Sequence, residues 1–343
     1  FMECCLALAI RGLGKVAPNP MVGSVVVHRD KIVSEGFHAL YGGPHAEVGA
    51  ISGIPSDIPK HECILYVNLE PCAHTGKTPP CTSLILESGI QHVVFAVRDP
   101  FEKVNGAGSR ILREHGVRVQ EGVLESKARF LNRRFFTFTE QKRPYIILKW
   151  AETSDGFIAR QDYSSKWISC ELSRRRVHQW RSQEVAVLVG TNTALYDNPK
   201  LTCRDTIGKN PIRIATDRRG VLPKTHSLFD QTAPTIVFTE KSDAAYSNAP
   251  GVDLVSCGSD FNKWLTELYR RGIQSIIVEG GGKLLSSFLE NHTWDEIRRF
   301  RSRENFVSGI AAPKLPLAPY LSSSIGEDTF ELYFAPRLAA LIE

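Results

Sequence analysis

The stretch that decides the fold reads PHAEV at positions 44–48 and EPC at 70–72, and Cys81 follows after eight further residues. One imidazole and two thiols can fill three positions of a tetrahedral zinc site, and catalytic zinc sites keep the fourth position for water. A carboxylate beside such a site can carry the proton that the water loses. The pattern predicts a catalytic zinc site with Glu47 as the acid–base group and His45, Cys72 and Cys81 as ligands.

The spacing of the two cysteines distinguishes this motif from related ones. His-x-Glu followed by Pro-Cys and a second cysteine is typical of zinc-dependent base deaminases. The nucleic-acid deaminases have two residues between the cysteines, whereas this chain has eight. The inserted loop carries His74 and Lys77, which we expect at the mouth of the substrate site, near a phosphate or a sugar. A solvated loop without a role in binding is the alternative.

Length and composition favour an ordinary globular protein with two domains. The chain has 343 residues, of which 42% are hydrophobic and 23% charged. No apolar run reaches the roughly 20 residues of a membrane span, and the first residues lack the basic segment of a secretory signal. Eight scattered cysteines suit a reducing cytoplasm. The net charge of +5 has no basic block, which suits a phosphorylated small molecule better than nucleic acid.

Strands and helices alternate through the first half, which indicates an α/β fold with a largely parallel, covered sheet. The apolar patterns predict strands at 22–27, 32–36, 63–69, 92–97 and 117–119. They predict helices at 3–12, from His45 onward, at 81–88, before Gly116 and at 124–138. The polar segment 141–144 ends in proline, so we expect one domain at 1–142 and another at 143–343.

The second half continues the alternation as far as Asn291. Its patterns predict strands at 145–150, 185–190, 212–216, 235–238, 252–255 and 275–278, with helices at 173–181, 261–271 and 283–289. The run EGGG at 279–282 lies between a strand and a helix, so it is either a phosphate cradle or a tight turn. After Asn291 the sequence predicts no element with certainty.

Read together, the two halves resemble the bifunctional deaminase/reductase family of riboflavin biosynthesis. The resemblance lies in NPMVG at 19–23, PHAEVGA at 44–50, EPCAHTGKTPPC at 70–81, KWAETSDG at 149–156, GT at 190–191, DNPKLTCR at 197–204 and VEGG at 278–281. The chain departs from the family where TS stands at 153–154 in place of Ser-Leu. It departs again at 298–303, where RRFRSR is more basic than the family's apolar strand.

The resemblance implies a cytidine-deaminase-like α/β/α sandwich followed by a dihydrofolate-reductase-like α/β domain. It implies a zinc-dependent hydrolytic deamination of a diaminopyrimidinone ribosyl phosphate, then an NADPH-dependent reduction of the ribosyl group to ribityl. The expected partners are this phosphorylated pyrimidine and further copies of the chain, without nucleic acid or membrane. A nucleic-acid base deaminase with an accessory domain is the main alternative, and a non-catalytic zinc protein is another.

The resemblance also assigns residues by matching position. NADPH would contact Ala151, Trp167, Thr193, Asp197, Gly281, Gly282, Lys283, Leu284, Leu285, Ser286 and Ser287. The substrate would contact Asn19, His74, Lys77, Ser165, Arg181, Leu201, Arg204 and Glu279. Arg181 and Arg204 suit a phosphate, because a guanidinium group matches phosphate in a bidentate way. Arg218 and Arg219 are hypotheses for the group that distinguishes NADPH from NADH.

Overall fold

The structure is a computed structural model that describes residues 1–73, 79–101, 105–165, 168–204, 206–256, 258 and 260–342. The chain divides into two compact units, Arg143–Ala339 and Phe1–Lys142, and Ala340–Glu343 is grouped with the latter. Among the described residues, no helix has the length and apolar character of a membrane span. Each unit is built around its own sheet.

The first unit contains a five-stranded sheet in the order β2-β1-β3-β4-β5. Its strands are β1 Gly23–His28, β2 Lys31–Phe37, β3 Ile64–Val67, β4 His92–Phe95 and β5 Arg118–Gln120. β1 runs antiparallel to both β2 and β3, whereas β3, β4 and β5 are parallel. The sheet is therefore mixed, with its parallel part at β3, β4 and β5.

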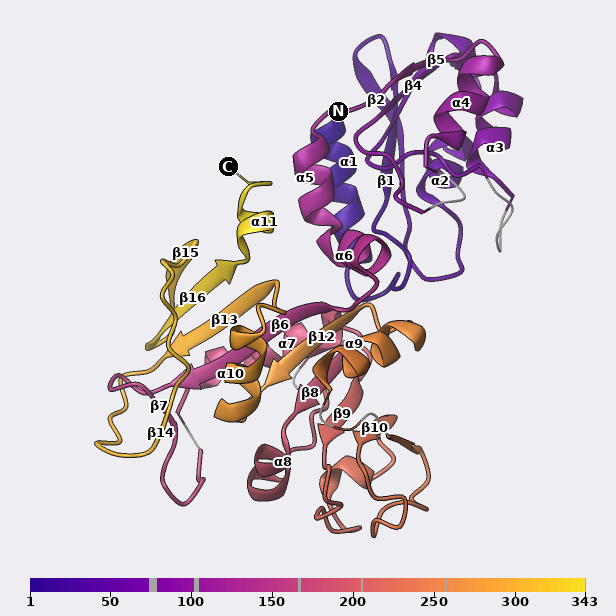
Figure 1. The fold of residues 1–343 in the computed structure, drawn as a ribbon. Coiled ribbons are helices and arrows are strands. Elements are labelled where there is room, and N and C mark those ends of the chain that lie inside the picture. The colour runs from indigo at the N-terminus through magenta and orange to yellow at the C-terminus, as the bar shows by residue number, and fades with distance from the viewer. Residues whose placement is uncertain are drawn as a thin grey trace. The chain divides into compact units, whose positions relative to one another are not determined.

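Helices cover both faces of this sheet. Successive residues of a strand point to opposite faces, so neighbouring valines of β1 pack against different helices. Val25 and Val27 pack with α1 Met2–Ala9, α5 Glu125–Leu131 and α6 Arg133–Gln141. Val26 packs on the other side with α2 Ala46–Ser52, α3 Cys81–Ser88 and α4 Ala107–Glu114. Figure 1 shows the two sets of helices on either side of the sheet, which makes this unit an α/β/α sandwich.

The single helix expected at 124–138 is wrong, because the chain breaks at Asn132 between α5 and α6. The Asn132 side chain is buried and binds the backbone of Met21, accepting from its N–H at 2.8 Å and donating to its carbonyl at 2.9 Å. A side chain that bonds distant backbone in this way competes with a continuous helix. The break thus fixes the loop that precedes β1.

The second unit contains a nine-stranded sheet in the order β11-β10-β9-β8-β12-β6-β13-β16-β15. Its strands are β6 Tyr145–Glu152, β8 Ala186–Val189, β9 Ile212–Thr216, β10 Thr235–Phe238, β11 Val252–Val255, β12 Ser275–Glu279, β13 Glu296–Arg301, β15 Leu321–Ile325 and β16 Asp328–Phe334. All neighbours are parallel except β16, which is antiparallel to β13 and β15. β7 Phe157–Ala159 and β14 Ile310–Ala311 form a separate pair.

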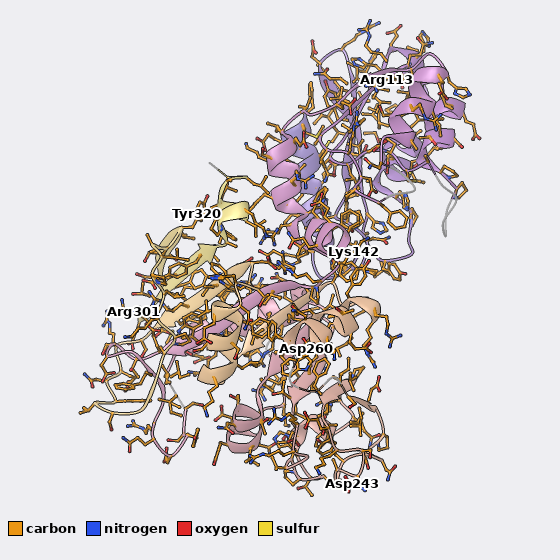
Figure 2. The ribbon with its side chains drawn as sticks, in the orientation of Figure 1. Arg113, Lys142, Asp243, Asp260, Arg301 and Tyr320 are labelled. Atoms are coloured by element: carbon orange, nitrogen blue, oxygen red, sulfur yellow. The ribbon has the colours of Figure 1, made fainter. Side chains whose placement is uncertain are left out.

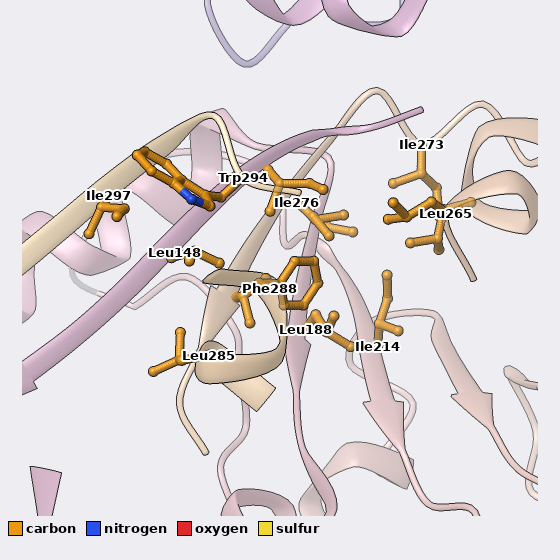
Figure 3. Packing of buried hydrophobic residues seen from close by; sticks show 14 of the residues in the cluster. Leu148, Leu188, Ile214, Leu265, Ile273, Ile276, Leu285, Phe288, Trp294 and Ile297 are labelled. Carbon is orange, nitrogen blue, oxygen red and sulfur yellow. The ribbon is translucent and has the colours of Figure 1, made fainter. Parts of the chain in front are cut away.

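Helices also cover both faces of this larger sheet. One core holds Leu148, Leu188 and Ile276 against α9 Phe261–Arg270 and α10 Gly282–Glu290, whose Leu285 and Phe288 point into it (Figure 3). On the opposite face, Trp180 of α7 Glu171–Gln183 packs against Phe300 and Phe330 with ring centroids 5.5 and 5.4 Å apart. The remaining helices of this unit are α8 Thr191–Asp197 and α11 Pro336–Ala339.

The basic run after Asp295 forms β13, an inner strand of the sheet between β6 and β16. Arg298 is buried, donates to Glu296 at 2.6 Å and lies 4.5 Å over the Trp180 ring. Arg299 donates to Glu331 and to the Tyr333 hydroxyl, both at 2.6 Å. Arg301, labelled in Figure 2, is the half-exposed end of the strand. A strand this basic stays in the sheet because carboxylates surround it.

Candidate metal site and cofactor cavity

Three predicted ligands of the first unit bring their donor atoms together. His45 precedes α2, Cys72 follows β3, and Cys81 is the first residue of α3. Their donor atoms all lie within 4.8 Å of one another, with His45 Nδ1 at 3.5 Å from the Cys72 Sγ and 3.3 Å from the Cys81 Sγ. Within the described part of the chain, this group contains no fourth protein donor. One nitrogen and two sulfurs fit a zinc ion that keeps a position for another ligand.

The charges around this cluster favour a thiolate. The hydrogen bond with the Cys81 thiol lowers the pKa of the Cys72 thiol to about 4, and His45 acts in the same direction. The Cys81 backbone N–H, at the start of α3, donates to the Cys72 sulfur at 3.2 Å. Glu47 is only 4% exposed, and this burial raises its pKa above the ordinary value. The carboxyl group thus lies beside the cluster with a tendency to hold a proton.

His38 packs against the predicted ligand His45 and also contacts Asn19. The His38 ring packs edge-on against the His45 ring, with centroids 5.7 Å apart. Its Nδ1 lies 2.9 Å from the Pro44 carbonyl, and its Nε2 lies 3.1 Å from the Asn19 Nδ2. A carbonyl only accepts, so Nδ1 carries the hydrogen and Nε2 accepts from the Asn19 amide. His38 therefore orients Asn19 as a neutral ring, and burial lowers its pKa accordingly.

The loop that carries Asn19 is held by two buried asparagines. Asn132 binds both backbone groups of Met21, as described above. The Asn68 side chain accepts from the Gly23 N–H at 2.7 Å and donates to the Met21 carbonyl at 3.1 Å. The loop is therefore rigidly placed in the first unit. His74 and Lys77, the other two predicted substrate residues there, lie outside the described residues.

The second unit contains a cavity of about 950 Å³ at the carboxyl ends of β6, β8 and β12. Ligands of open α/β sheets bind at this edge. The cavity is lined by most of the residues predicted for the reductase, namely Ala151, Ser165, Arg181, Thr193, Asp197, Leu201, Arg204, Glu279, Gly281, Gly282, Lys283, Leu284 and Ser287. Trp167 lies outside the described residues.

Leu285 and Ser286 do not line this cavity, which corrects the contiguous segment predicted from Gly281 to Ser287. Leu285 is fully buried in the core between α10 and the sheet, where Figure 3 shows it. Successive residues of a helix turn by about 100°, so one segment cannot present every side chain to one ligand. Lys283, Leu284 and Ser287 face the cavity, and Leu285 faces the core.

A cluster of buried charges lies on the wall of the cavity. Glu279, the last residue of β12, accepts from Arg181 Nε at 2.6 Å and from Nη2 at 2.9 Å, and Lys149 Nζ lies 3.9 Å away. Burial alone would raise the pKa of Glu279, but the charges of Arg181 and Lys149 lower it to about 2. Arg181 therefore faces a carboxylate, and its expected contact with the substrate phosphate stays a prediction.

Lys149 is a cavity residue that the sequence analysis did not assign. It lies in β6, within the apolar stretch YIILKWAE, and burial lowers its pKa below the ordinary value. A lysine inside a buried strand is expensive unless it is paired or functional. The signal in the sequence that could have identified Lys149 is a single charge between two apolar residues, Leu148 and Trp150.

Two predicted residues from different segments of the cavity lining bind each other. The Ser165 hydroxyl donates to the two oxygens of Asp197 at 3.0 and 3.1 Å. Nearby, the Tyr163 and Tyr196 rings stack with centroids 4.3 Å apart and planes 4° from parallel. These contacts join the loop after β7 to α8 at the rim of the cavity.

The glycine turn before α10 allows a close approach to the backbone. Gly280 and Gly281 have φ values of 92° and 80°, which residues with a Cβ seldom adopt. A Cβ on Gly281 would lie 3.3 Å from the Thr193 hydroxyl. The first N–H groups of α10 have no partner within the helix, so they suit an anion at this end of the cavity.

Comparisons with known proteins agree with this architecture. Residues 1–97 match the cytidine and deoxycytidylate deaminase zinc-binding region, and residues 144–301 match the RibD C-terminal domain. The riboflavin biosynthesis protein RibD of Aquifex aeolicus is 43% identical over 316 residues, covering 91% of this chain and 88% of that protein. The corresponding protein of Bacillus amyloliquefaciens is 40% identical over 325 residues, covering 92% and 86%.

Solved structures give the same result. A diaminohydroxyphosphoribosylaminopyrimidine deaminase/5-amino-6-(5-phosphoribosylamino)uracil reductase from Thermotoga maritima has a TM-score of 0.89 and 42% identity, covering 97% of both chains. RibD of Acinetobacter baumannii has a TM-score of 0.88 and 30% identity over the same shares.

Fold and comparisons define a class of two-domain enzymes that join a zinc-binding deaminase domain to a reductase domain related to NADPH-dependent reductases. The chain belongs to the RibD family of riboflavin biosynthesis proteins. This confirms the predicted family, its two folds and its bifunctional deaminase and reductase activity, with zinc and NADPH as cofactors.

Proposed function

We propose that residues 1–142 deaminate a diaminopyrimidinone ribosyl phosphate, and that residues 143–343 then reduce the ribosyl group of the product to ribityl with NADPH. The observation that carries the proposal is the group of His45, Cys72 and Cys81 beside the buried carboxyl of Glu47. The name of the Thermotoga maritima relative, which joins a pyrimidine deaminase to a uracil reductase, supports the order of the two steps.

In the deaminase half, each residue of the site has a distinct role. Zinc held by His45, Cys72 and Cys81 supplies a Lewis acid that makes water acidic near neutral pH. Glu47 takes the proton from the attacking water and gives it to the departing amino nitrogen, which leaves as ammonia. The Asn19 amide, oriented by His38, offers its carbonyl oxygen to the pyrimidine ring.

In the reductase half, the cofactor supplies the hydride and the protein supplies position and protons. The glycine turn and the first N–H groups of α10 suit the pyrophosphate of NADPH. Lys149 Nζ, oriented by Glu279, would give a proton to the ribose oxygen of a substrate bound in the cavity, and NADPH held there would supply the hydride. Arg204 is exposed at the cavity and is the better of the two predicted arginines for the substrate phosphate.

One experiment separates the two reactions. The purified protein is supplied with the pyrimidine substrate, with and without NADPH, while ammonia release and NADPH absorbance are followed. We expect ammonia in both cases and NADPH oxidation only after deamination has begun. An absence of ammonia would contradict the deaminase half, and immediate oxidation of NADPH by the undeaminated substrate would contradict the order of the steps.

The finer expectations about partners and location belong to the same proposal: a phosphorylated pyrimidine as substrate, no nucleic acid or membrane, a cytoplasmic location and a homo-oligomer. The edge strand β15 supports the last, since Leu321 and the preceding Tyr320 are exposed beside unpaired backbone. Light scattering would test the oligomer. Salt-dependent binding to RNA would favour the alternative nucleic-acid deaminase instead.

A further inference from the structure

His178 is a buried residue of the cavity wall that no step of the proposed reduction uses. It lies in α7, where the residues that line the cavity follow helical spacing, namely Arg174, Val177, His178 and Arg181. Only 8% of His178 is exposed. A histidine in this place is either a packed side chain or a group that contacts the bound molecule, and its two ring nitrogens decide between these alternatives.

The Nδ1 atom of His178 is held by the segment that leads to Arg204. It lies 3.1 Å from the Thr202 carbonyl oxygen and 3.3 Å from the Arg204 backbone nitrogen. One ring nitrogen cannot donate to the carbonyl and accept from the N–H at the same time. The shorter distance favours the carbonyl, so Nδ1 carries the ring hydrogen. The same carbonyl accepts from Arg181 Nη1 at 3.1 Å, and its two lone pairs allow both bonds.

The Nε2 atom of His178 is open to the cavity. In the part of the chain that the structure describes, this atom has no hydrogen-bond partner. It is also not one of the described buried polar atoms that lack a partner, which are His92 Nε2 and Arg298 Nη1. Because the rest of the side chain is enclosed, Nε2 reaches the cavity that His178 lines. With the hydrogen on Nδ1, Nε2 offers a lone pair to a donor in the cavity.

The surroundings of the ring keep it neutral. Burial lowers the pKa of His178 below the ordinary value, and the charges of Arg181 and Arg204 act in the same direction. The Thr202 carbonyl and Glu279 oppose this shift without reversing it. A neutral ring keeps the lone pair on Nε2, which a protonated ring would lose. His178 therefore presents a hydrogen-bond acceptor beside two cations.

An acceptor beside cations suits the two parts of a phosphorylated sugar. The phosphate oxygens accept, so they match the exposed guanidinium group of Arg204 and not a lone pair. A sugar hydroxyl can donate, so it matches Nε2. We propose that His178 is a further substrate-contacting residue of the reductase site, whose Nε2 accepts a hydrogen bond from a ribosyl hydroxyl while Arg204 binds the phosphate. This inference rests on the proposed reductase function and concerns how the ribosyl group is recognised.

Two substitutions separate the two ring nitrogens. Asparagine places an amide nitrogen near the position of Nδ1, whereas glutamine places a polar atom near the position of Nε2. In His178→Asn the bond to Thr202 is kept, and the KM for the deaminated product rises about 2- to 10-fold because one hydrogen bond is lost. The kcat stays within about twofold, as expected for a contact made equally before and during the reaction. In His178→Gln the KM returns to within about twofold of the wild-type value.

The controls distinguish this contact from a structural role. Gln179→Ala is the matched control, since the neighbouring Gln179 is exposed and does not line the cavity. The affinity for NADPH, measured by calorimetry, stays within about twofold in all three variants, because the contact is to the substrate. A wild-type KM in His178→Asn, or an equal loss of NADPH affinity, would overturn the assignment. A raised KM in His178→Gln alone would show that only the bond to Thr202 matters and would overturn it too.

Ribose 5-phosphate tests the contact without turnover. The wild-type protein binds it more tightly than inorganic phosphate. In His178→Asn the affinity for ribose 5-phosphate falls about 2- to 10-fold, and the affinity for inorganic phosphate stays within about twofold. Equal binding of ribose 5-phosphate by the two proteins would contradict the hydroxyl contact. The expected binding without NADPH oxidation by the wild-type protein and deaminated product would contradict the reductase function and leave the contact standing.

Discussion

The two sites of this protein are built in opposite ways. The candidate metal site needs three side chains whose donor atoms lie within 4.8 Å, and its residues come from one stretch of chain between His45 and Cys81. The reductase cavity of about 950 Å³ takes its lining from segments between Lys149 and Ile310. One site depends on a few atoms at fixed distances, and the other depends on a whole sheet edge.

This difference predicts two kinds of sensitivity to substitution. A metal site loses its function when one ligand is removed, because the remaining donors do not hold the ion in the same way. A large cavity loses affinity in steps, since each contact contributes a part of the binding free energy. The substitutions below test that contrast, from the largest expected effect to the smallest.

Cys81→Ser is expected to have the largest effect. The variant loses one of two sulfur donors, so its zinc content and its ammonia release fall to background, while NADPH oxidation with the deaminated product continues. Elemental analysis and the two activity assays measure this. Cys4→Ser is the control, because Cys4 is exposed and outside the cluster. Full zinc content in Cys81→Ser would contradict the expectation that the metal site fails when one ligand is removed.

Glu47→Gln is expected to separate chemistry from metal binding. The amide keeps the shape of the side chain but cannot shuttle a proton, so zinc remains at one per chain and ammonia release falls about 10²- to 10⁴-fold. Glu35→Gln, an exposed change on β2, serves as the control. Undiminished ammonia release would refute the role of Glu47.

Arg181→Met is expected to destabilise the second unit, because it leaves Glu279 buried beside Lys149 alone. Removing one partner of a buried ion pair lowers the free energy of unfolding by about 3–5 kcal/mol, and the nearby lysine favours the lower end. Urea unfolding measures the change. Arg175→Ala on the same helix pairs only with exposed Glu171, so its effect stays below about 1 kcal/mol.

The same pair predicts a pH dependence. The folded-state pKa of Glu279 is about 2, below the ordinary value of 4.5. A carboxyl group with a lowered pKa contributes its stability above the unfolded pKa and loses it as pH falls towards the folded one. The contribution is therefore present above pH 4.5 and declines between pH 4.5 and 2. Unfolding of Glu279→Gln across this range should lack that part of the decline.

Leu285→Ala is expected to act on stability alone. The side chain is fully buried between α10 and the sheet, so its truncation lowers the free energy of unfolding by about 2–5 kcal/mol. The affinity for NADPH stays within about twofold. Ser287→Ala, at a position that lines the cavity, should show a weaker NADPH affinity with little loss of stability. A loss of NADPH affinity in Leu285→Ala without a loss of stability would indicate that Leu285 contacts the cofactor.

The sequence predicted the first site better than the second for a physical reason. Zinc chemistry restricts ligand types so strongly that His45, Cys72 and Cys81 stand out within one stretch, and the structure brings their donor atoms together. Regular apolar patterns also located most strands of both sheets. In the reductase cavity, positional matching found most lining residues but could not separate the two faces of α10, which decides between Leu284 and Leu285.

Tertiary contacts account for the misses. The helix break at Asn132 depends on a hydrogen bond to Met21, 111 residues away in sequence. The pairing of Arg181 with Glu279 joins residues 98 positions apart, so neither arginine pattern nor spacing reveals it. β13 lacks the apolar alternation by which a strand is recognised in sequence. Its arginines are tolerated inside the sheet because they form ion pairs with Glu296, Glu331 and Glu152. Such partners become visible only when the sheet is assembled.

The arginine-rich β13 also constrains how this chain can change over time. Replacing Arg298 by an apolar residue would remove a cation that two buried carboxylates share, Glu184 and Glu296, whereas replacing one of these glutamates would leave the other beside the arginine. The apolar strand typical of the family is therefore several simultaneous exchanges away. We expect Arg298, Glu184 and Glu296 to covary among close relatives and to tolerate single substitutions poorly.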